Sequence, residues 1–338
     1  MAAEANGSNR IEMQAICKYF TGVKALDNVS LTAQSGYVYA IVGENGAGKS
    51  TLLKIMNGDY TMTSGRMLLN GAQQNFTAPK DAIDAGISVI YQERQIVANM
   101  TVAENVFLGN WLRKKSGLVD YDGMAAQAKR IIDEFGLPID PNEKVKNLSA
   151  AYQQMVEIMK AYARNAKVIA FDEPTASLTD AEIEVLFRII KKMKAENKII
   201  FYVSHRMKEI SEIADKIIVF KDGVLVGSVD CGAVTMNELV KMMVGRDLGD
   251  IFKELPFNDH PGEVVLEVKG LCNAKVQDVS FQVRAGEVVG FSGLVGAGRT
   301  EVFEALCGIT KLEKGTVEVN GKKVHFRHPR EAIDAGVG

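Results

Sequence analysis

The sequence predicts an α/β fold with a parallel sheet, and three observations lead to this prediction. Short apolar runs rich in β-branched and aromatic residues occur at 37–42, 168–171 and 198–203, and such runs are typical of buried strands. Segments with helical character follow two of them, at 49–56 and 180–196; the second has the acidic start that suits a helix dipole. Apolar strands that alternate with helices predict a parallel sheet covered on both faces.

The remaining elements fit around that sheet. Residues 87–91 are a further expected strand, and Asp222-Gly223 between the two apolar runs of 217–227 is a hairpin signal. Between 93 and 163 the strand pattern disappears and helical stretches replace it. We therefore expect a helical insertion there.

The chain contains an internal repeat, which sets its domain organisation. The two copies share three stretches with a constant offset of 250 positions (293 − 43, 332 − 82). A constant offset indicates the same element order with no net gap. The matching stretches are 28–31 with 278–281, 43–50 with 293–300, and 82–86 with 332–336.

The second copy stops short of the first. Gly338 corresponds to Ser88, so we expect the chain to be a piece of a longer protein with two complete copies. The predicted organisation is a first domain at 1–247, a linker at 248–262 that contains Pro256, Pro261 and Gly262, and the beginning of a second domain at 263–338.

Composition limits the class of protein. The chain has 338 residues and a net charge of −2, which provides no broad electrostatic footprint for nucleic acid. We expect no secretion signal, no membrane-spanning helix and no nucleic-acid partner. Four cysteines without paired spacing are expected to be reduced, as in a cytosolic protein; they are Cys17, Cys231, Cys272 and Cys307.

The strongest motif is Gly43-Glu-Asn-Gly-Ala-Gly-Lys-Ser50, which fits the P-loop pattern between a predicted strand and a predicted helix. Its glycines allow the backbone N–H groups to point at phosphate oxygens, and the helix adds its positive N-terminal end. Lys49 would reach the β- and γ-phosphates, and the Ser50 hydroxyl would bind Mg²⁺. The expected nucleotide-binding residues are Gly43, Glu44, Asn45, Gly46, Ala47, Gly48, Lys49, Ser50 and Thr51.

Two acidic residues end the predicted strand at 168–171. Open α/β sheets bind ligands at the carboxyl ends of their strands, which is where Asp172 and Glu173 lie. Asp172 would hold the magnesium shell, and Glu173 would orient and deprotonate an attacking water. Without the P-loop, the two residues could equally be an ordinary acidic pair at the end of a strand.

Three further candidates are weaker on the residues alone. His205 follows a predicted strand and would contact the γ-phosphate, Gln92 would contact the magnesium shell or its water, and Phe20 would stack on adenine. A structural histidine, an ordinary polar residue at a strand end and a core aromatic are the alternative interpretations.

These motifs and candidate residues, in their order along the chain, resemble those of the ATP-binding cassette family, and the resemblance covers the whole chain. The resemblance implies a P-loop NTPase cassette with a parallel core sheet, an antiparallel β subdomain and a helical subdomain at about 93–163, plus a partial second cassette. It strengthens Phe20, Gln92 and His205 as site residues, and it marks Leu148-Ser149 as the start of a signature motif. Glu173, His205 and Lys49 are then the catalytic residues, and Ser50, Gln92 and Asp172 the metal-binding ones.

A finer resemblance links three stretches to ATPases of monosaccharide importers for ribose, galactose and xylose. They are residues 18–26, 153–158 and 293–300. The resemblance implies ATP and Mg²⁺ as cofactors and ATP-driven import of a sugar or similar solute. It also implies a peripheral position on the cytoplasmic face of the membrane, permease subunits as partners, and indirectly a periplasmic or lipid-anchored solute-binding protein.

The sequence departs from the family pattern in several places. The family signature Leu-Ser-Gly-Gly-Gln reads here Leu148, Ser149, Ala150, Ala151 and Tyr152, and a Cβ on each former glycine should weaken backbone approach to a phosphate. The second P-loop has Arg299 for lysine, between Gly293, Gly298 and Thr300. After Pro174-Thr175, the family's Ser-Ala-Leu-Asp becomes Ala-Ser-Leu-Thr. The offset of 250 places Gly270 opposite Phe20, so the second copy lacks that aromatic.

In this family cassettes pair head to tail, which predicts asymmetric sites in a full-length chain. The first P-loop would hydrolyse ATP opposite the second cassette's signature, and the Arg299 site would bind weakly or regulate. We expect this chain to bind Mg-ATP but to turn it over poorly by itself. Two alternatives are a soluble ABC ATPase of the translation or DNA-repair type and a module that binds nucleotide without hydrolysis.

Overall fold

The computed structural model describes residues 9–176, 178–245, 258, 260–293 and 296–338. The chain divides into two compact units, Met1–Ile251 and Phe252–Gly338, and each is described by itself. The predicted linker at 248–262 falls largely outside the described residues, so the predicted domain bounds stay a prediction.

A six-stranded sheet forms the centre of the first unit, in the strand order β10-β9-β3-β8-β7-β6. Every neighbouring pair is parallel except β9 with the edge strand β10. The expected parallel sheet is therefore confirmed, with one antiparallel edge. The strands are β3 (Val38–Val42), β6 (Ile87–Ile90), β7 (Val168–Asp172), β8 (Ile199–Val203), β9 (Lys216–Lys221) and β10 (Val224–Asp230).

Strands β3, β7 and β8 are buried along their whole length. Strands covered on both faces lack the polar alternation of a half-exposed strand, which is why these segments appear as continuous apolar runs in the sequence. The β9–β10 hairpin turns at Asp222 and Gly223, which have φ values of 48° and 79°. Two consecutive positive φ values are the geometry of a type I′ turn, as the Asp-Gly pair predicts.

A second sheet, antiparallel, has the order β2-β1-β4-β5. Helix α1 (Lys49–Met56) and residues of both sheets share one apolar core. Helix α2 (Pro79–Ala85) leads into β6. The strands are β1 (Arg10–Phe20), β2 (Val23–Gln34), β4 (Ser64–Leu69) and β5 (Ala72–Gln74).

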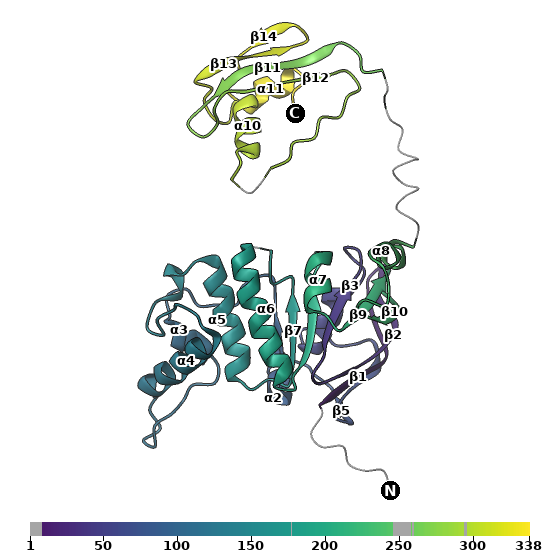
Figure 1. The fold of residues 1–338 in the computed structure, drawn as a ribbon, viewed down its shortest axis with the longest axis vertical. Helices are drawn as coiled ribbons and strands as arrows, with labels where there is room; N and C mark the ends of the chain where they lie inside the picture. The colour runs from purple at the N-terminus through teal and green to yellow at the C-terminus, as the bar shows by residue number, and fades with distance from the viewer. Residues whose placement is uncertain (1–8, 177, 246–257, 259, 294–295) are drawn as a thin grey trace. The chain divides into compact units, whose positions relative to one another are not determined.

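Helices dominate between β6 and β7, as expected for the insertion. They are α3 (Val102–Val106), α4 (Tyr121–Phe135), the short 3₁₀ helix η1 (Val145–Asn147) and α5 (Ala150–Ala163), and Figure 1 shows α3, α4 and α5 gathered at one side of the first unit. Three more helices follow: α6 (Asp180–Ala195), α7 (Met207–Ile213) and α8 (Met236–Val244). No helix among the described residues has the length and apolar character needed to cross a membrane.

The second unit repeats the antiparallel sheet of the first, with the order β12-β11-β13-β14. Its elements are β11 (Val264–Cys272), β12 (Val279–Arg284), α10 (Arg299–Leu306), β13 (Lys314–Val319), β14 (Lys322–Val324) and α11 (Pro329–Asp334). The described part of this unit contains no strand ahead of α10 that corresponds to β3.

The structure corrects the sequence match of Gly270 with Phe20. Gly270 and Ala15 occupy the same place, because each has a positive φ (61° and 51°) and each N–H donates to a serine hydroxyl at 2.9 Å. Before this point the copies are therefore offset by 255 positions (270 − 15). A turn at 273–276, closed by an N–H···O=C bond of 2.9 Å, replaces the longer hairpin tip that carries Phe20. Phe20 thus has no counterpart, and the offset of 250 applies only beyond the turn.

Candidate functional site

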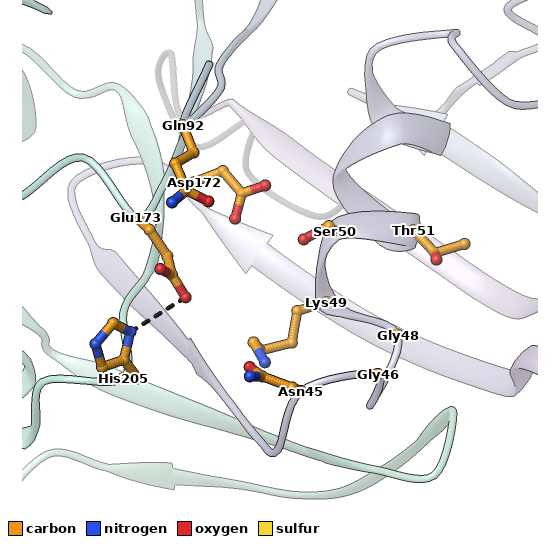
Figure 2. Close-up of a pocket in the computed structure, with 10 residues that line it drawn as sticks. All are labelled: Asn45, Gly46, Gly48, Lys49, Ser50, Thr51, Gln92, Asp172, Glu173 and His205. Atoms are coloured by element: carbon orange, nitrogen blue, oxygen red, sulfur yellow. Dashed lines mark ion pairs between the residues drawn. The ribbon is translucent and has the colours of Figure 1, made fainter. Parts of the chain in front are cut away.

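A cavity of about 690 Å³ opens at the carboxyl ends of β3, β7 and β8, a size usual for small-molecule sites. Ten of the predicted site residues meet in it, although they are up to 160 positions apart in the sequence (205 − 45). Figure 2 shows the ten that line it. They are Asn45, Gly46, Gly48, Lys49, Ser50, Thr51, Gln92, Asp172, Glu173 and His205.

The P-loop joins β3 to α1, and close backbone contacts require two of its glycines, Gly43 and Gly48. A Cβ on Gly43 would lie 2.3 Å from the carbonyl oxygen of Phe220. Gly48 caps α1 with a φ of 100°, and a Cβ there would lie 2.5 Å from the carbonyl oxygen of Ala25. Any larger residue would push the loop away from β2 and β9. The tight curl follows from glycine at these positions.

Lys49 is buried, with 9% of its surface exposed. Its Nζ donates to the carbonyl oxygens of Gly43 at 2.8 Å and Glu44 at 2.9 Å. Burial lowers the pKa of Lys49, and the nearby Glu173 and Asp172 carboxylates oppose that shift. An ammonium group has three N–H donors, so the geometry fixes Lys49 across its own loop with one donor left for a ligand oxygen.

Asp172 ends β7 opposite Ser50, and Figure 2 shows its carboxylate pointing toward that hydroxyl. Burial raises the pKa of Asp172, and a hydrogen bond from Ser50 partly offsets the rise. With Gln92 nearby in the same lining, the donors are a carboxylate, a hydroxyl and an amide. This set fits Mg²⁺, which prefers oxygen ligands and is usually bound by one or two carboxylates together with substrate phosphates.

Glu173 and His205 are in contact in the lining of the cavity. His205 Nδ1 lies 3.2 Å from Glu173 Oε1, the contact marked in Figure 2. Glu173 has a φ of 49°, and its N–H donates to the carbonyl of Val203 at 3.0 Å. A left-handed conformation at a residue with a side chain is strained and tends to occur at functional sites. The strand ends thus hold a carboxylate in a fixed, partly exposed position.

Other predicted residues lie behind the cavity or apart from it. Gly43, Glu44 and Ala47 belong to the P-loop but are not among the lining residues. Phe20 also lies outside the lining; it is 41% exposed, and its ring contacts Tyr60 edge-on at 5.3 Å between centroids. Stacking of Phe20 on adenine stays a prediction.

The signature segment Leu148, Ser149, Ala150, Ala151 and Tyr152 lies at the beginning of α5 and does not line the cavity. The Ser149 side chain caps the helix by accepting the N–H of Tyr152 at 3.4 Å. In the second P-loop, Leu294 and Val295 lie outside the described residues, and Arg299 and Thr300 are exposed at the start of α10. The signature segment is therefore separate from the lining of the first cavity.

The sequence analysis missed a buried carboxylate directly behind the cavity. Glu209 on α7 is 5% exposed and accepts hydrogen bonds from Thr175, Tyr202 and Ser204. Its signal was weak: an acidic residue four positions after His205 resembles any exposed residue in the first turn of a helix. Only the fold shows that three hydroxyl groups surround it.

The chain matches the ABC transporter family model over residues 26–176 and 276–337, and it belongs to this family. Its fold is that of solved cassettes: a nucleotide-free ATP-binding cassette from an ABC transporter matches with a TM-score of 0.59 and 24% identity over 70% of this chain and 96% of that one. A cassette in its ADP conformation matches with a TM-score of 0.60 and 24% identity over 70% and 99%. The α/β P-loop cassette is therefore confirmed.

Curated relatives are similar over nearly the whole chain. The Yersinia pestis ribose import ATP-binding protein RbsA is 46% identical over 97% of this chain and 64% of its own length. The arabinose import ATP-binding protein AraG of the same species is 47% identical over 99% and 64%. A putative ribose/galactose/methyl galactoside import ATP-binding protein of Geobacillus kaustophilus is 46% identical over 97% and 65%. The chain thus spans about 64% of the length of these relatives.

Proposed function

We propose that this chain binds Mg-ATP in the first cavity and hydrolyses it, and that hydrolysis drives import of a sugar. The observation that carries the proposal is the meeting of Lys49, Asp172 and Glu173 in one cavity at the strand ends. This arrangement combines a phosphate-binding loop, a metal ligand and a carboxylate base. The parts match those of P-loop phosphoryl transfer, where catalysis depends on positioning and electrostatics.

The phosphate end of the cavity is built from the P-loop backbone and Lys49. The loop N–H groups and the start of α1 favour negative charge, and the buried Lys49 ammonium would contact β- and γ-phosphate oxygens with little competing water. Ser50, Asp172 and Gln92 would hold Mg²⁺ beside them. The ion would neutralise charge on the transferring phosphate.

At the other end, Glu173 would accept a proton from the attacking water. A carboxylate needs to lie within hydrogen-bond reach of that water, and Glu173, which has a strained backbone, lines the cavity. His205, in contact with Glu173, would orient this carboxylate and contact the γ-phosphate. We infer that His205 distinguishes ATP from ADP in this way.

The import role rests on the relatives. RbsA, AraG and the Geobacillus protein are named for import of ribose, arabinose and related sugars. These names support a permease partner, an indirect link to a solute-binding protein, and a place on the cytoplasmic face of the membrane. They favour import over a soluble translation or repair ATPase.

We further infer that the two P-loops are unequal in a head-to-tail pair of cassettes. The segment Leu148–Tyr152 would face the second P-loop, and its two alanines would hold the backbone of α5 away from a phosphate. The first P-loop would face the signature of a second cassette. Turnover by this chain alone should then be slow, and fast turnover would mean that two copies pair through Leu148–Tyr152.

The test is a comparison of wild type with Glu173→Gln. The variant keeps the shape and size of the side chain but removes the base, so ATP affinity should persist while phosphate release falls by about a hundredfold or more. Calorimetry measures affinity, and a phosphate-release assay measures turnover. Equal turnover in both proteins would remove Glu173 from the mechanism, and loss of ATP affinity would give it a binding role instead.

A further inference from the structure

The carboxylate of Glu209 connects two loops of the cavity that are far apart in sequence. Thr175 Oγ1 donates to Glu209 Oε2 at 3.0 Å, and Ser204 Oγ donates to the same oxygen at 2.8 Å. Thr175 is two residues beyond Glu173, and Ser204 directly precedes His205. One carboxylate oxygen therefore holds the backbone on both sides of the Glu173–His205 contact.

Glu209 has its other partners within the fold. Tyr202 on β8 donates its hydroxyl to Oε2 at 2.9 Å, and Arg206 Nη1 lies 3.3 Å from Oε1. Burial and the Glu209 carboxylate raise the pKa of Tyr202, so the phenol keeps its proton and remains a donor. A buried carboxylate is stable only when donors surround it, and here donors cover both oxygens.

The Glu173 loop needs such an anchor. The φ of 49° at Glu173 is unfavourable for a residue with a side chain, and strained conformations persist only where neighbouring contacts enforce them. Two contacts that support it are the Glu173 N–H bond to Val203 and the Thr175 hydroxyl bond to Glu209. The first fixes the strand end, and the second fixes the turn after it.

We propose that Glu209 is a positioning residue that sets the distance between Glu173 and His205. It does so by holding the Thr175 turn and the Ser204 turn on one carboxylate oxygen, without touching the nucleotide itself. This inference rests on the proposed function, because it concerns the residues assigned there to the attacking water and the γ-phosphate.

The cluster offers a matched set of variants that each remove one donor. Thr175→Val releases the Glu173 side, and Ser204→Ala releases the His205 side. Tyr202→Phe removes a bond to the same oxygen but from a strand residue, so it loosens neither loop and is the control. Glu209→Ala is avoided as the main test, because it leaves three buried hydroxyl groups without an acceptor. Thr175→Ser restores the donor and is the rescue variant.

The first readout is the imidazole resonance of His205 in the full chain, assigned by its loss in His205→Ala and measured without nucleotide. Glu173→Gln defines the resonance position when the contact with the carboxylate is lost. Thr175→Val and Ser204→Ala should move the resonance toward that position, and Tyr202→Phe and Thr175→Ser should leave it at the wild-type position. A shift in Tyr202→Phe as large as in the loop variants would overturn the proposal, as would unmoved resonances in both loop variants.

The second readout is phosphate release at saturating Mg-ATP. It should fall about tenfold in each loop variant, the scale of one lost hydrogen bond to a charged group, with an unchanged calorimetric affinity for ATP. Tyr202→Phe should change the rate less than twofold. Equal losses in all three variants would mean that Glu209 is only structural. Failure of the chain to bind Mg-ATP would contradict the proposed function. The His205 resonance would still test whether Glu209 positions the two loops.

Discussion

The two P-loops of this chain differ far more in their surroundings than in their sequences. The first follows β3, whose Val38 is fully buried between β8 and β9. In the second, Val288 is the counterpart of Val38 and is 97% exposed, and residues 287–293 form no strand. Lys49 is buried and Arg299 is exposed. Among the described residues, only the first phosphate-binding motif is therefore supported by a sheet on both sides.

The physical reason is that a buried strand needs hydrogen-bonding neighbours on both sides. In the first unit β8 and β9 supply them, and they also deliver His205 and the backbone that packs against Gly43. The described residues of the second unit include counterparts of β1, β2, β4 and β5 but none of β7, β8 or β9. The residues described in the second unit therefore contain no counterparts of Asp172, Glu173 and His205.

The largest expected effect comes from two separate substitutions, one in each P-loop. Lys49→Arg should weaken Mg-ATP binding roughly a hundredfold, because a bulky guanidinium cannot make the two carbonyl contacts of Lys49 in the same space. Arg299→Lys should create no second site, because the loop lacks its supporting strand. Calorimetry measures both. A new site in Arg299→Lys would show that residue type matters more than the surrounding sheet.

A second test concerns the strand ahead of each loop. Val38→Ala should lower the free energy of unfolding of the first unit by about 2 kcal/mol. Val288→Ala should change stability by less than about 0.5 kcal/mol. Urea unfolding followed by fluorescence reports on the first unit, because Trp111 is the only tryptophan; circular dichroism serves for Val288→Ala. A similar loss in both variants would contradict the contrast in burial.

The hairpin tip is a third difference between the copies. If Phe20 stacks on adenine, Phe20→Ala should lower ATP affinity about fivefold and leave the affinity for inorganic tripolyphosphate unchanged, because tripolyphosphate has no base. Competition binding compares the two ligands. Equal weakening for both would place the effect of Phe20 in the loop fold instead of in base recognition.

The smallest expected effect is a change in the pH dependence of stability, and it concerns Glu157 on helix α5. This helix has no counterpart among the described residues of the second unit. Burial raises the pKa of Glu157 above its ordinary value of 4.5, and its Oε2 has no hydrogen-bond partner. A raised carboxyl pKa means that the folded state loses stability as pH rises from 4.5 toward the raised value. Glu157→Gln removes this loss.

The variant should therefore match wild type at pH 4.5 and become more stable at pH 8, by up to about 1 kcal/mol, the scale of one buried polar group. Urea titrations at the two pH values, followed by Trp111 fluorescence, measure the difference. A variant that is less stable at pH 8 than at pH 4.5, relative to wild type, would reverse the assigned sign.

The sequence predicted the parts of the fold that local pattern determines. The runs at 168–171 and 198–203 became β7 and β8, and Asp222-Gly223 became the expected hairpin turn. The repeat also predicted the common order of the two antiparallel sheets. Its offset failed around Gly270, because five fewer residues connect β11 to β12 than the constant offset of 250 assumed (255 − 250). Such a register change becomes visible only when the strand pairing of the two sheets is compared.

The site was predicted as a set of residues but not as a geometry. Motifs identified Lys49, Asp172, Glu173 and His205, since each follows a strand. The anchoring by Glu209 could not be predicted, because it depends on three hydroxyl groups meeting through tertiary packing.

The most direct test of the account is the stoichiometry of Mg-ATP binding to this chain. Calorimetry should give one ATP per chain in wild type and in Arg299→Ala, and no binding in Lys49→Ala, because only the first P-loop has the buried lysine and the strands around it. Two ATP molecules per chain, or binding that survives Lys49→Ala, would contradict the claim that the supporting sheet makes the site.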